Sequence, residues 1–165
     1  SDIDIGGKAV VVDSDIIISS GWNKFASIDL KSNGLNWVET LPHNAATANL
    51  LPLYYTNNLV FASLGNYGNL NILDANTGAH KKVIKDIGTE WFATPFNYYD
   101  GLIWFTSTAG LYALDANANI KYALKNEDAL EQLKGNFTNG FAIDQSTGYM
   151  YGLRGEAFVC FKTKH

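Results

Sequence analysis

The sequence predicts an all-β fold, a β-propeller of about four up-and-down blades with four strands each. Short runs of Val, Ile, Leu, Phe and Tyr alternate along the chain with turns rich in Asn, Asp and Gly, a pattern typical of short antiparallel strands. One of these runs recurs every 41 to 47 residues, which is the period of propeller blades. Charged residues make up 17% of the chain and aromatic residues 13%, which favours sheets that are buried on both faces.

The recurring run sets the register of the repeat. Its first three copies end in Asp29, Asp74 and Asp115, which are 45 and 41 residues apart, and the fourth ends in Lys162, 47 residues later. Around these runs we expect a single propeller domain or segment, residues 1–165. Its blades are expected at about 8–40, 45–86, 93–125 and 139–165.

Each blade is expected to contain the same succession of strands, and the recurring run is the third of them. For the first blade the pattern predicts strands at 9–12, 16–20, 25–28 and 35–39. For the second blade it predicts strands at 49–53, 59–63, 70–73 and 81–85. For the third blade it predicts strands at 94–98, 102–106, 111–114 and 120–124. The last blade offers only three strands, at 140–143, 149–153 and 157–161.

The turns support the same interpretation. Residues that tolerate positive φ join the first strand of each blade to the second, at 13–15, 56–58, 100–101 and 145–148. The recurring aspartates begin the turn after the third strand, where a carboxylate can accept backbone N–H bonds from two residues further on. We therefore interpret Asp29, Asp74 and Asp115 as structural rather than catalytic residues.

One segment departs from the strand pattern. Residues 127–134 are good helix formers, Asn126 is a suitable N-cap, and Gly135 is a suitable stop. We expect one short helix, inserted between blades three and four.

The charges and the single cysteine exclude several classes of function. The net charge is −4 and no basic stripe is present, so nucleic acid is not expected as a partner. Lys81, Lys82 and Lys85 are interpreted as one solvated strand edge. Cys160 lies in an apolar run and is expected to be a small buried residue, with no disulfide and no multi-cysteine metal site. No stretch has the length of a membrane-spanning helix and none resembles a signal peptide, so direct membrane insertion is not expected.

The repeat resembles the pyrroloquinoline-quinone-like (PQQ-like) propeller repeat, whose core reads Leu-Tyr-Ala-Leu-Asp-Ala-x-Thr-Gly followed by a tryptophan. Residues 111–116 match this core closely, and residues 74–78 supply its Asp-Ala-Asn-Thr-Gly part. Trp37 stands where the repeat places the tryptophan that docks one blade on another. Tyr122 takes that place in blade three, whereas Lys82 in blade two departs from the pattern.

The resemblance implies a larger wheel than this chain provides. PQQ-like propellers usually have seven or eight blades, so about four blades imply a partial propeller. Self-association or the remainder of a larger propeller would complete it. Ile3 and Ile5 alternate with aspartates and could supply a strand that closes the last blade. The resemblance alone also implies an extracytoplasmic location, in the periplasm or at the cell surface.

The resemblance does not imply an enzyme. Quinone-dependent dehydrogenases of this family hold PQQ with Ca²⁺ ligands, a catalytic aspartate, a stacking tryptophan and often adjacent cysteines, and none of these can be matched here position by position. His43, His80 and His165 lie far apart and lack the spacing of metal ligands. We expect no catalytic residue, no metal and no cofactor. A dehydrogenase fragment is one alternative, and the extracellular propeller of a sensor kinase, which residues 100–105 and 110–112 resemble, is another.

The expected function is that of a non-enzymatic scaffold that recognises a protein or a carbohydrate. In an up-and-down blade, the loops between strands two and three share one face of the propeller with the loops between blades. Aromatic and charged side chains on loops of a rigid scaffold are typical of binding surfaces. The alternative is that Trp22 and Trp91 pack between blades. The candidate ligand-binding residues on this loop face are Trp22, His43, Tyr67, Glu90, Trp91 and Arg154.

Overall fold

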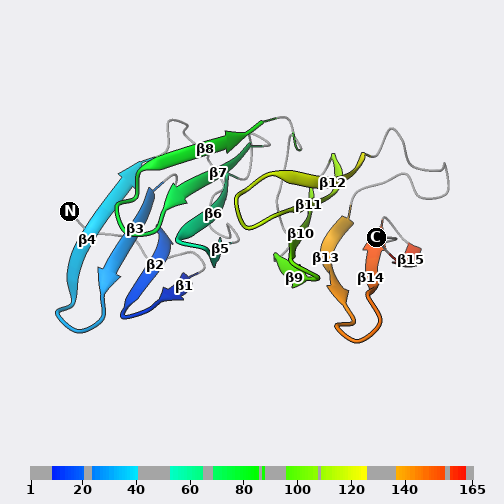
Figure 1. Ribbon diagram of the computed structural model, residues 1–165, viewed down its shortest axis with the longest axis horizontal. Helices are drawn as coiled ribbons and strands as arrows, with labels where there is room; N and C mark the ends of the chain where they lie inside the picture. The colour runs from blue at the N-terminus through cyan, green and yellow to red at the C-terminus, as the bar shows by residue number, and fades with distance from the viewer. Residues whose placement is uncertain are drawn as a thin grey trace.

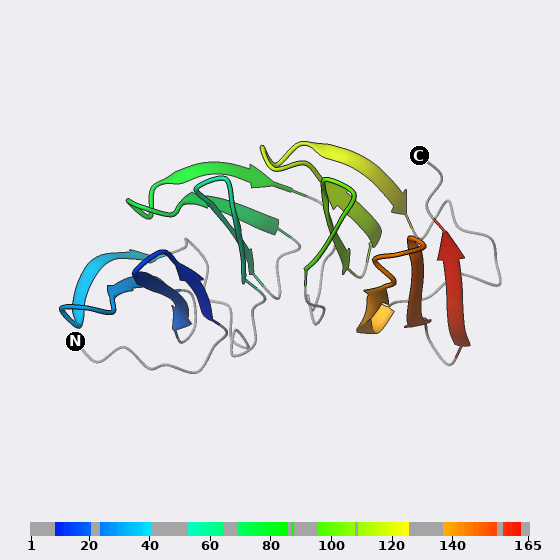
Figure 2. The same ribbon diagram turned by 60° about the horizontal axis from the view of Figure 1, so that its bottom comes forward.

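The chain is folded into four antiparallel sheets that follow one another along an arc (Figures 1 and 2). The computed structural model describes residues 9–20, 24–40, 53–64, 69–85, 87, 96–107, 109–125, 137–154 and 157–162. The last strands of the first three sheets run along the convex side of the arc, and the first strands lie on its concave side (Figure 1). The described residues contain strands and turns but no helix, and the arrangement confirms the all-β, partial-propeller fold expected from the sequence.

Each sheet is one blade, and its strands pair in the order in which they occur in the chain. Blade one contains β1 (Ala9–Val12), β2 (Asp15–Ser20), β3 (Lys24–Asp29) and β4 (Gly34–Thr40). Blade two contains β5 (Leu53–Thr56), β6 (Leu59–Leu64), β7 (Asn69–Asp74) and β8 (His80–Ile84). Blade three contains β9 (Asn97–Tyr99), β10 (Leu102–Ser107), β11 (Gly110–Leu114) and β12 (Ile120–Lys125). Blade four contains β13 (Phe137–Ile143), β14 (Tyr149–Arg154) and β15 (Ala157–Lys162).

Two-residue turns join the first and second strands of blades two and three, and these turns set the pairing register. Asn57 and Asn58 both have positive φ, 51° and 59°, between the paired residues of β5 and β6. Asp100 and Gly101 do the same between β9 and β10, with φ of 49° and 75°. Positive φ at both central residues gives the turn a twist that matches the twist of the flanking strands. The expectation drawn from Asn, Asp and Gly at these places is confirmed.

The first strand of blade three begins later than the apolar pattern predicts. β9 begins at Asn97, and Phe96 before it is not part of a strand, whereas residues 49–52 and 94–95 lie outside the described residues. Apolar residues stand on both sides of the start of β9, so composition alone does not mark it. The turn that follows each strand decides the register, because pairing propagates outward from that turn. The helix expected at 127–134 and the strand expected around Ile3 and Ile5 lie outside the described residues.

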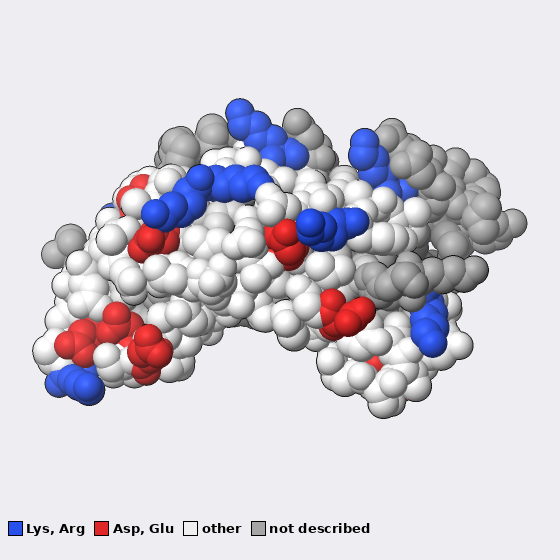
Figure 3. Space-filling model, viewed as in Figure 1, with Lys and Arg blue, Asp and Glu red and all other residues white. Residues whose placement is uncertain are grey.

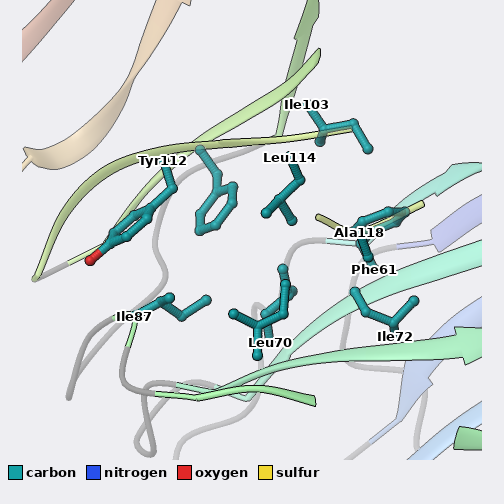
Figure 4. Close-up of a cluster of buried hydrophobic side chains, with 10 residues drawn as sticks. Phe61, Leu70, Ile72, Ile87, Ile103, Tyr112, Leu114 and Ala118 are labelled. Atoms are coloured by element: carbon teal, nitrogen blue, oxygen red, sulfur yellow. The ribbon is translucent and has the colours of Figure 1, made fainter. Parts of the chain in front are cut away.

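The core of the molecule lies between the blades. We call the side of a blade that looks toward the next blade in the chain its forward face, and the opposite side its backward face. In the joint between blades two and three, Phe61 and Leu70 on the forward face of blade two share a buried cluster with Ile103, Tyr112 and Leu114 on the backward face of blade three (Figure 4). Burying each side chain of this size contributes about 1.5–3 kcal/mol. Each blade is therefore stabilised chiefly by its neighbours.

Trp37 joins blade one to blade two in the way that the repeat pattern predicts. Its Nε1 donates a hydrogen bond to the carbonyl of Ala75 at 2.9 Å, in the turn between β7 and β8. Its ring lies against Gly78, where an added Cβ would come within 2.6 Å of the ring atom Cε3. Gly78 also has a φ of +73°. The glycine of the repeat is thus required twice, by the backbone of its own turn and by the tryptophan of the preceding blade.

The expectation that Cys160 is buried is wrong. Its side chain is exposed, on the forward face of blade four. The corresponding positions in blades two and three are Ile72 and Ala113, which are covered by the next blade. No described blade follows blade four, so an apolar run that is buried elsewhere in the repeat faces solvent here.

We expect Gly78→Ala to destabilise the protein more than Gly101→Ala. Both glycines have nearly the same positive φ, and the alanine backbone penalty of about 1–2 kcal/mol applies to both. Only at Gly78 does the new Cβ meet the Trp37 ring, because nothing lies within 4 Å at Gly101. The overpacking should add about 1–3 kcal/mol to the loss. Urea denaturation of the two variants measures the difference, and equal losses would contradict the docking role of Trp37.

Candidate functional site

The strand topology divides the propeller into two faces with different kinds of connection. The turns between strands one and two and between strands three and four emerge on one face, which we call the turn face. The strand ends that lead from strand two to strand three, and from blade to blade, lie on the opposite loop face. On the turn face the connections are short and well hydrogen-bonded. On the loop face the segments between consecutive blades are longer, at 41–52, 85–96 and 126–136.

Aspartate carboxylates hold the turns of the turn face. Asp29 accepts hydrogen bonds from the Lys31 N–H at 2.9 Å and from the Ser32 hydroxyl at 2.7 Å. Asp74 accepts from the Asn76 and Thr77 N–H groups, both at 3.0 Å. This is the structural role that the sequence predicts for the recurring aspartates.

Asp115 repeats the arrangement in blade three. It accepts hydrogen bonds from the N–H groups of Asn117 and Asn119, both at 2.9 Å, and from the Asn119 side-chain amide at 3.1 Å. Burial by itself raises the pKa of Asp115, but these bonds and the Lys121 ammonium at 3.4 Å outweigh it and lower the pKa to about 2. The carboxylate is therefore charged and engaged at neutral pH, unlike a general acid or base with a pKa near the working pH.

The sequence pattern missed a fourth aspartate of this kind. Asp144 lies between β13 and β14, where it accepts bonds from the Ser146 N–H at 2.8 Å and the Ser146 hydroxyl at 2.7 Å. The hydroxyls of Ser146 and Thr147, followed by the backbone bond from Ser146, lower the pKa of Asp144 to about 2. The repeat search aligned aspartates after the third strand only, whereas this one follows a first strand. The Asp-x-x-Thr pattern of residues 144–147 carried the signal.

The strand ends that flank the six candidate ligand-binding residues lie on the loop face, but the structure does not describe the side chains of these residues. Trp22 falls between β2 and β3, and Tyr67 falls between β6 and β7. His43 falls between blades one and two, and Glu90 and Trp91 fall between blades two and three. The sixth, Arg154, is the last residue of β14. That the six side chains lie together on the loop face therefore stays a prediction.

The described residues also form a groove on the convex rim. It has a volume of about 340 Å³ and lies between β8 and the turn that joins β11 to β12. Exposed Val83 and Ile120 provide apolar surface in it. The residues that line it are Lys82, Val83, Ile84, Lys85, Ala118, Asn119 and Ile120.

Lys82 closes one part of this groove. Its Nζ donates hydrogen bonds to the Ala118 carbonyl at 2.7 Å and to the Asn119 side-chain carbonyl at 3.2 Å. Lys82 stands eight residues after Asp74, as Trp37 stands eight residues after Asp29, and both residues bond to a carbonyl in the turn of the next blade. The lysine that departs from the repeat pattern therefore performs the same linking role with a different chemistry.

Lysine side chains run along β8 and the neighbouring start of β12 on the rim (Figure 3). Lys81 pairs with Asp74 at 3.2 Å and Lys121 pairs with Asp115 at 3.4 Å, so each is partly neutralised by the carboxylate of its own turn. Exposed pairs of this kind contribute little to stability. Lys81, Lys82 and Lys85 are all exposed, as expected of a solvated strand edge, and Lys82 in addition bonds across the joint.

The forward face of blade four carries an uncovered aromatic surface that the sequence did not single out. The rings of Tyr149 and Tyr151 lie 6.4 Å apart, and those of Tyr151 and Phe158 lie 6.3 Å apart. The Lys162 ammonium lies 5.3 Å from the centre of the Tyr149 ring. Alternation within β14 and β15 was visible in the sequence, but only the arrangement of the blades shows which face is left open.

The next features concern metal-ligand groups and membrane-spanning helices among the described residues. Among the described residues, no group of three or more His, Cys, Asp and Glu side chains is arranged to hold a metal ion. The same part of the chain contains no helix long and apolar enough to cross a membrane.

The fold is similar to solved propellers of very different length. BamB from Moraxella catarrhalis matches with a TM-score of 0.73 and 16% identity, over 96% of this chain and 46% of that chain. The quinohemoprotein alcohol dehydrogenase from Comamonas testosteroni matches with a TM-score of 0.65 and 15% identity, over 92% of this chain and 29% of that one. The computationally designed Ika4 protein matches with a TM-score of 0.66 and 8% identity, over 99% of this chain and 94% of that one.

These likenesses define the class of fold, a PQQ-like β-propeller, and confirm the resemblance that the repeat indicated. The chain matches no family model and no curated protein. It spans about half the length of BamB and less than a third of the alcohol dehydrogenase. At 16% identity and below, the matches show the fold and do not distinguish a binding protein from an enzyme.

We expect acid to weaken the fold through the turn aspartates. The pKa of Asp115 is about 2 in the folded protein and 3.8 in its ordinary state, so its stabilisation is complete above about pH 5 and is lost as the pH falls through 3.8 toward 2. Asp115→Asn should lower the urea midpoint at pH 7 and flatten its decline between pH 5 and pH 2. Asp13→Asn, in a turn of blade one, is the control and should keep the native pH profile. An unchanged decline in Asp115→Asn would contradict the role of the carboxylate.

We expect Lys82→Ala to cost about 1 kcal/mol of unfolding free energy, because it removes two hydrogen bonds across the joint between blades two and three. Lys85→Ala, from the same groove, is the matched control and should change stability by less than about 0.5 kcal/mol. Chemical denaturation of both variants measures the difference. Equal effects would mean that Lys82 is an ordinary solvated lysine.

Proposed function

We propose that this chain is part of a non-enzymatic interaction scaffold that recognises a protein or a carbohydrate through the loop face. The observation that supports this proposal most directly is the difference between the two faces in the length and hydrogen bonding of their connections. Four carboxylates of the turn face, those of Asp29, Asp74, Asp115 and Asp144, accept hydrogen bonds within their own turns, as structural carboxylates do. The longer connections, between blades, leave from strand ends on the loop face.

The chemistry of those residues favours recognition over catalysis. Trp22, Tyr67 and Trp91 can stack on sugar rings or fill a hydrophobic pocket of a protein, and His43, Glu90 and Arg154 can supply hydrogen bonds around them. Loops held by packed sheets pay little ordering entropy on binding, so a rigid arc of blades suits this task. We include in the proposal that residues 1–165 act as one propeller segment in an extracytoplasmic protein, as the resemblance to PQQ-like repeats implies.

The principal alternative is a fragment of a quinone-dependent dehydrogenase. It draws on the likeness to the quinohemoprotein alcohol dehydrogenase, which at 15% identity extends to the fold alone. A sensor-kinase propeller is the other alternative. Its parent chain would continue into membrane-spanning and kinase segments, which the complete gene would reveal.

We expect substitutions on the loop face to weaken binding by at least about tenfold, the loss typical of a central aromatic contact. The chain is screened on a glycan array and against displayed peptides, and the affinity of each recovered ligand is measured for Trp22→Ser and Trp91→Ser. Lys31→Ser, on the turn face, is the control because its side chain lies on the opposite side of the sheets. A ligand that binds all three variants equally well would contradict the proposed face.

The same preparation tests the enzymatic alternative. PQQ and Ca²⁺ are added together with an electron-accepting dye and a panel of primary alcohols. Sustained dye reduction that depends on all components would overturn the scaffold proposal, and its absence together with loop-face binding would support it.

A further inference from the structure

We propose that the forward face of blade four docks on the backward face of blade one in a second copy of this chain, so that two arcs close into one ring. The proposal is independent of what the loop face binds. It depends on the two end blades, on the joints already formed within the chain, and on the side chains that the end blades leave uncovered.

One position of the repeat shows what blade four lacks. It lies on the third strand, four residues before the recurring aspartate or its counterpart Lys162. Phe25, Leu70 and Leu111 occupy it in blades one to three, and each is 0% exposed because the following blade covers it. Phe158 occupies it in blade four and is 70% exposed. The same kind of side chain is thus buried three times and left in solvent once.

The rest of that face has the character of an interface. Leu153, paired with Phe158 across β14 and β15, is 41% exposed, and Tyr149 is 40% exposed. Together with Tyr151 they form a continuous, mostly aromatic surface. Exposed apolar surfaces rich in Tyr and Phe mark protein–protein contacts, and monomeric proteins rarely leave them open.

The backward face of blade one is open along one row only, because Ile18 and Ala26 on the same face are 3% and 1% exposed. One row of its backward face consists of the cross-strand partners Val11, Ile16, Ile28 and Leu35. Val11 is 64% exposed and Leu35 is 54% exposed, and the two isoleucines between them are only half-buried.

The same row is covered in the middle of the arc. In blade two, Val60 and Leu73 take the places of the two isoleucines, and both are fully buried against blade one. In blade three, Ile103 and Leu114 take these places and are fully buried against blade two. The open row of blade one therefore has the apolar character that the equivalent rows use for contact with a forward face.

The three joints within the chain define what partner fits. Each joins the forward face of one blade to the backward face of the next. The partner of blade four must therefore present a backward face, and a second copy presents one on its blade one. The contact then occurs twice, once at each end, and the ring closes without a free end. This chain covers 46% of BamB, so two copies together have about the length of that chain.

The native chain is expected to have twice the 18.1 kDa mass of one copy in light scattering after size exclusion. Phe158→Glu and Val11→Glu should each weaken the dimer at least about tenfold, because either change places a charge in both joints of the ring. Both side chains are exposed in the single arc, so the variants should remain folded. Circular dichroism and a cooperative urea transition check this. Tyr98→Glu is the matched control, because Tyr98 occupies the place of Val11 in blade three and is 51% exposed within the arc.

Mixing the two variants tests the head-to-tail arrangement. A dimer of one Phe158→Glu copy and one Val11→Glu copy has both charges in one joint and leaves the other joint native. The mixture should therefore dimerise more strongly than either variant alone. A native mass of 18.1 kDa would overturn the proposal and assign the open faces to blades of a longer chain or another protein. Dimerisation that Phe158→Glu abolishes and Val11→Glu leaves intact would also overturn it, because blade four would then pair with itself.

Discussion

A blade of this chain is a small sheet with two apolar faces, and water is an unfavourable environment for both. A sheet of three or four strands gains much of its stability by burying a face against another element, so each blade depends on the one before it and the one after it. The three buried clusters found among the described residues lie between blades for this reason. The arc, the position of the core and the character of its two ends all follow from this dependence.

Hydrogen bonds between blades make an otherwise apolar contact directional. Trp37 bonds to the Ala75 carbonyl and packs on Gly78, and Lys82 bonds to the Ala118 carbonyl one joint further along. In both cases a fourth-strand side chain reaches into a turn that an aspartate holds in shape. A turn without its aspartate would present its carbonyl less well, so the carboxylates support the joints as well as their own hairpins. The recurring aspartate is thus part of how blades recognise each other.

The same dependence separates two surfaces of the molecule. The end blades expose apolar faces whose partners must be blades, whether in a second copy or in another chain. Loops that join strands do not have to complete a sheet-to-sheet contact, and the proposal assigns the loop face to a ligand for this reason. A ligand-binding role therefore fits the loop face, and an assembly role fits the end faces. The rim groove near Lys82 lies between them and is partly occupied by the link across the joint.

Much of the fold was present in the sequence alone. The spacing of Asp29, Asp74 and Asp115 determined the blades, the alternation of apolar residues determined most strands, and the Asn, Asp and Gly turns determined the hairpins, because these signals are local. The start of β9, the bond that Lys82 makes across the joint and the exposure of Cys160 and Phe158 were decided by tertiary structure. Strand starts depend on register propagated from a turn, and burial depends on whether a neighbouring blade is present. Neither the start of a strand nor the burial of a side chain can be read from one run of residues, because an apolar strand has the same sequence whether its face is covered or open.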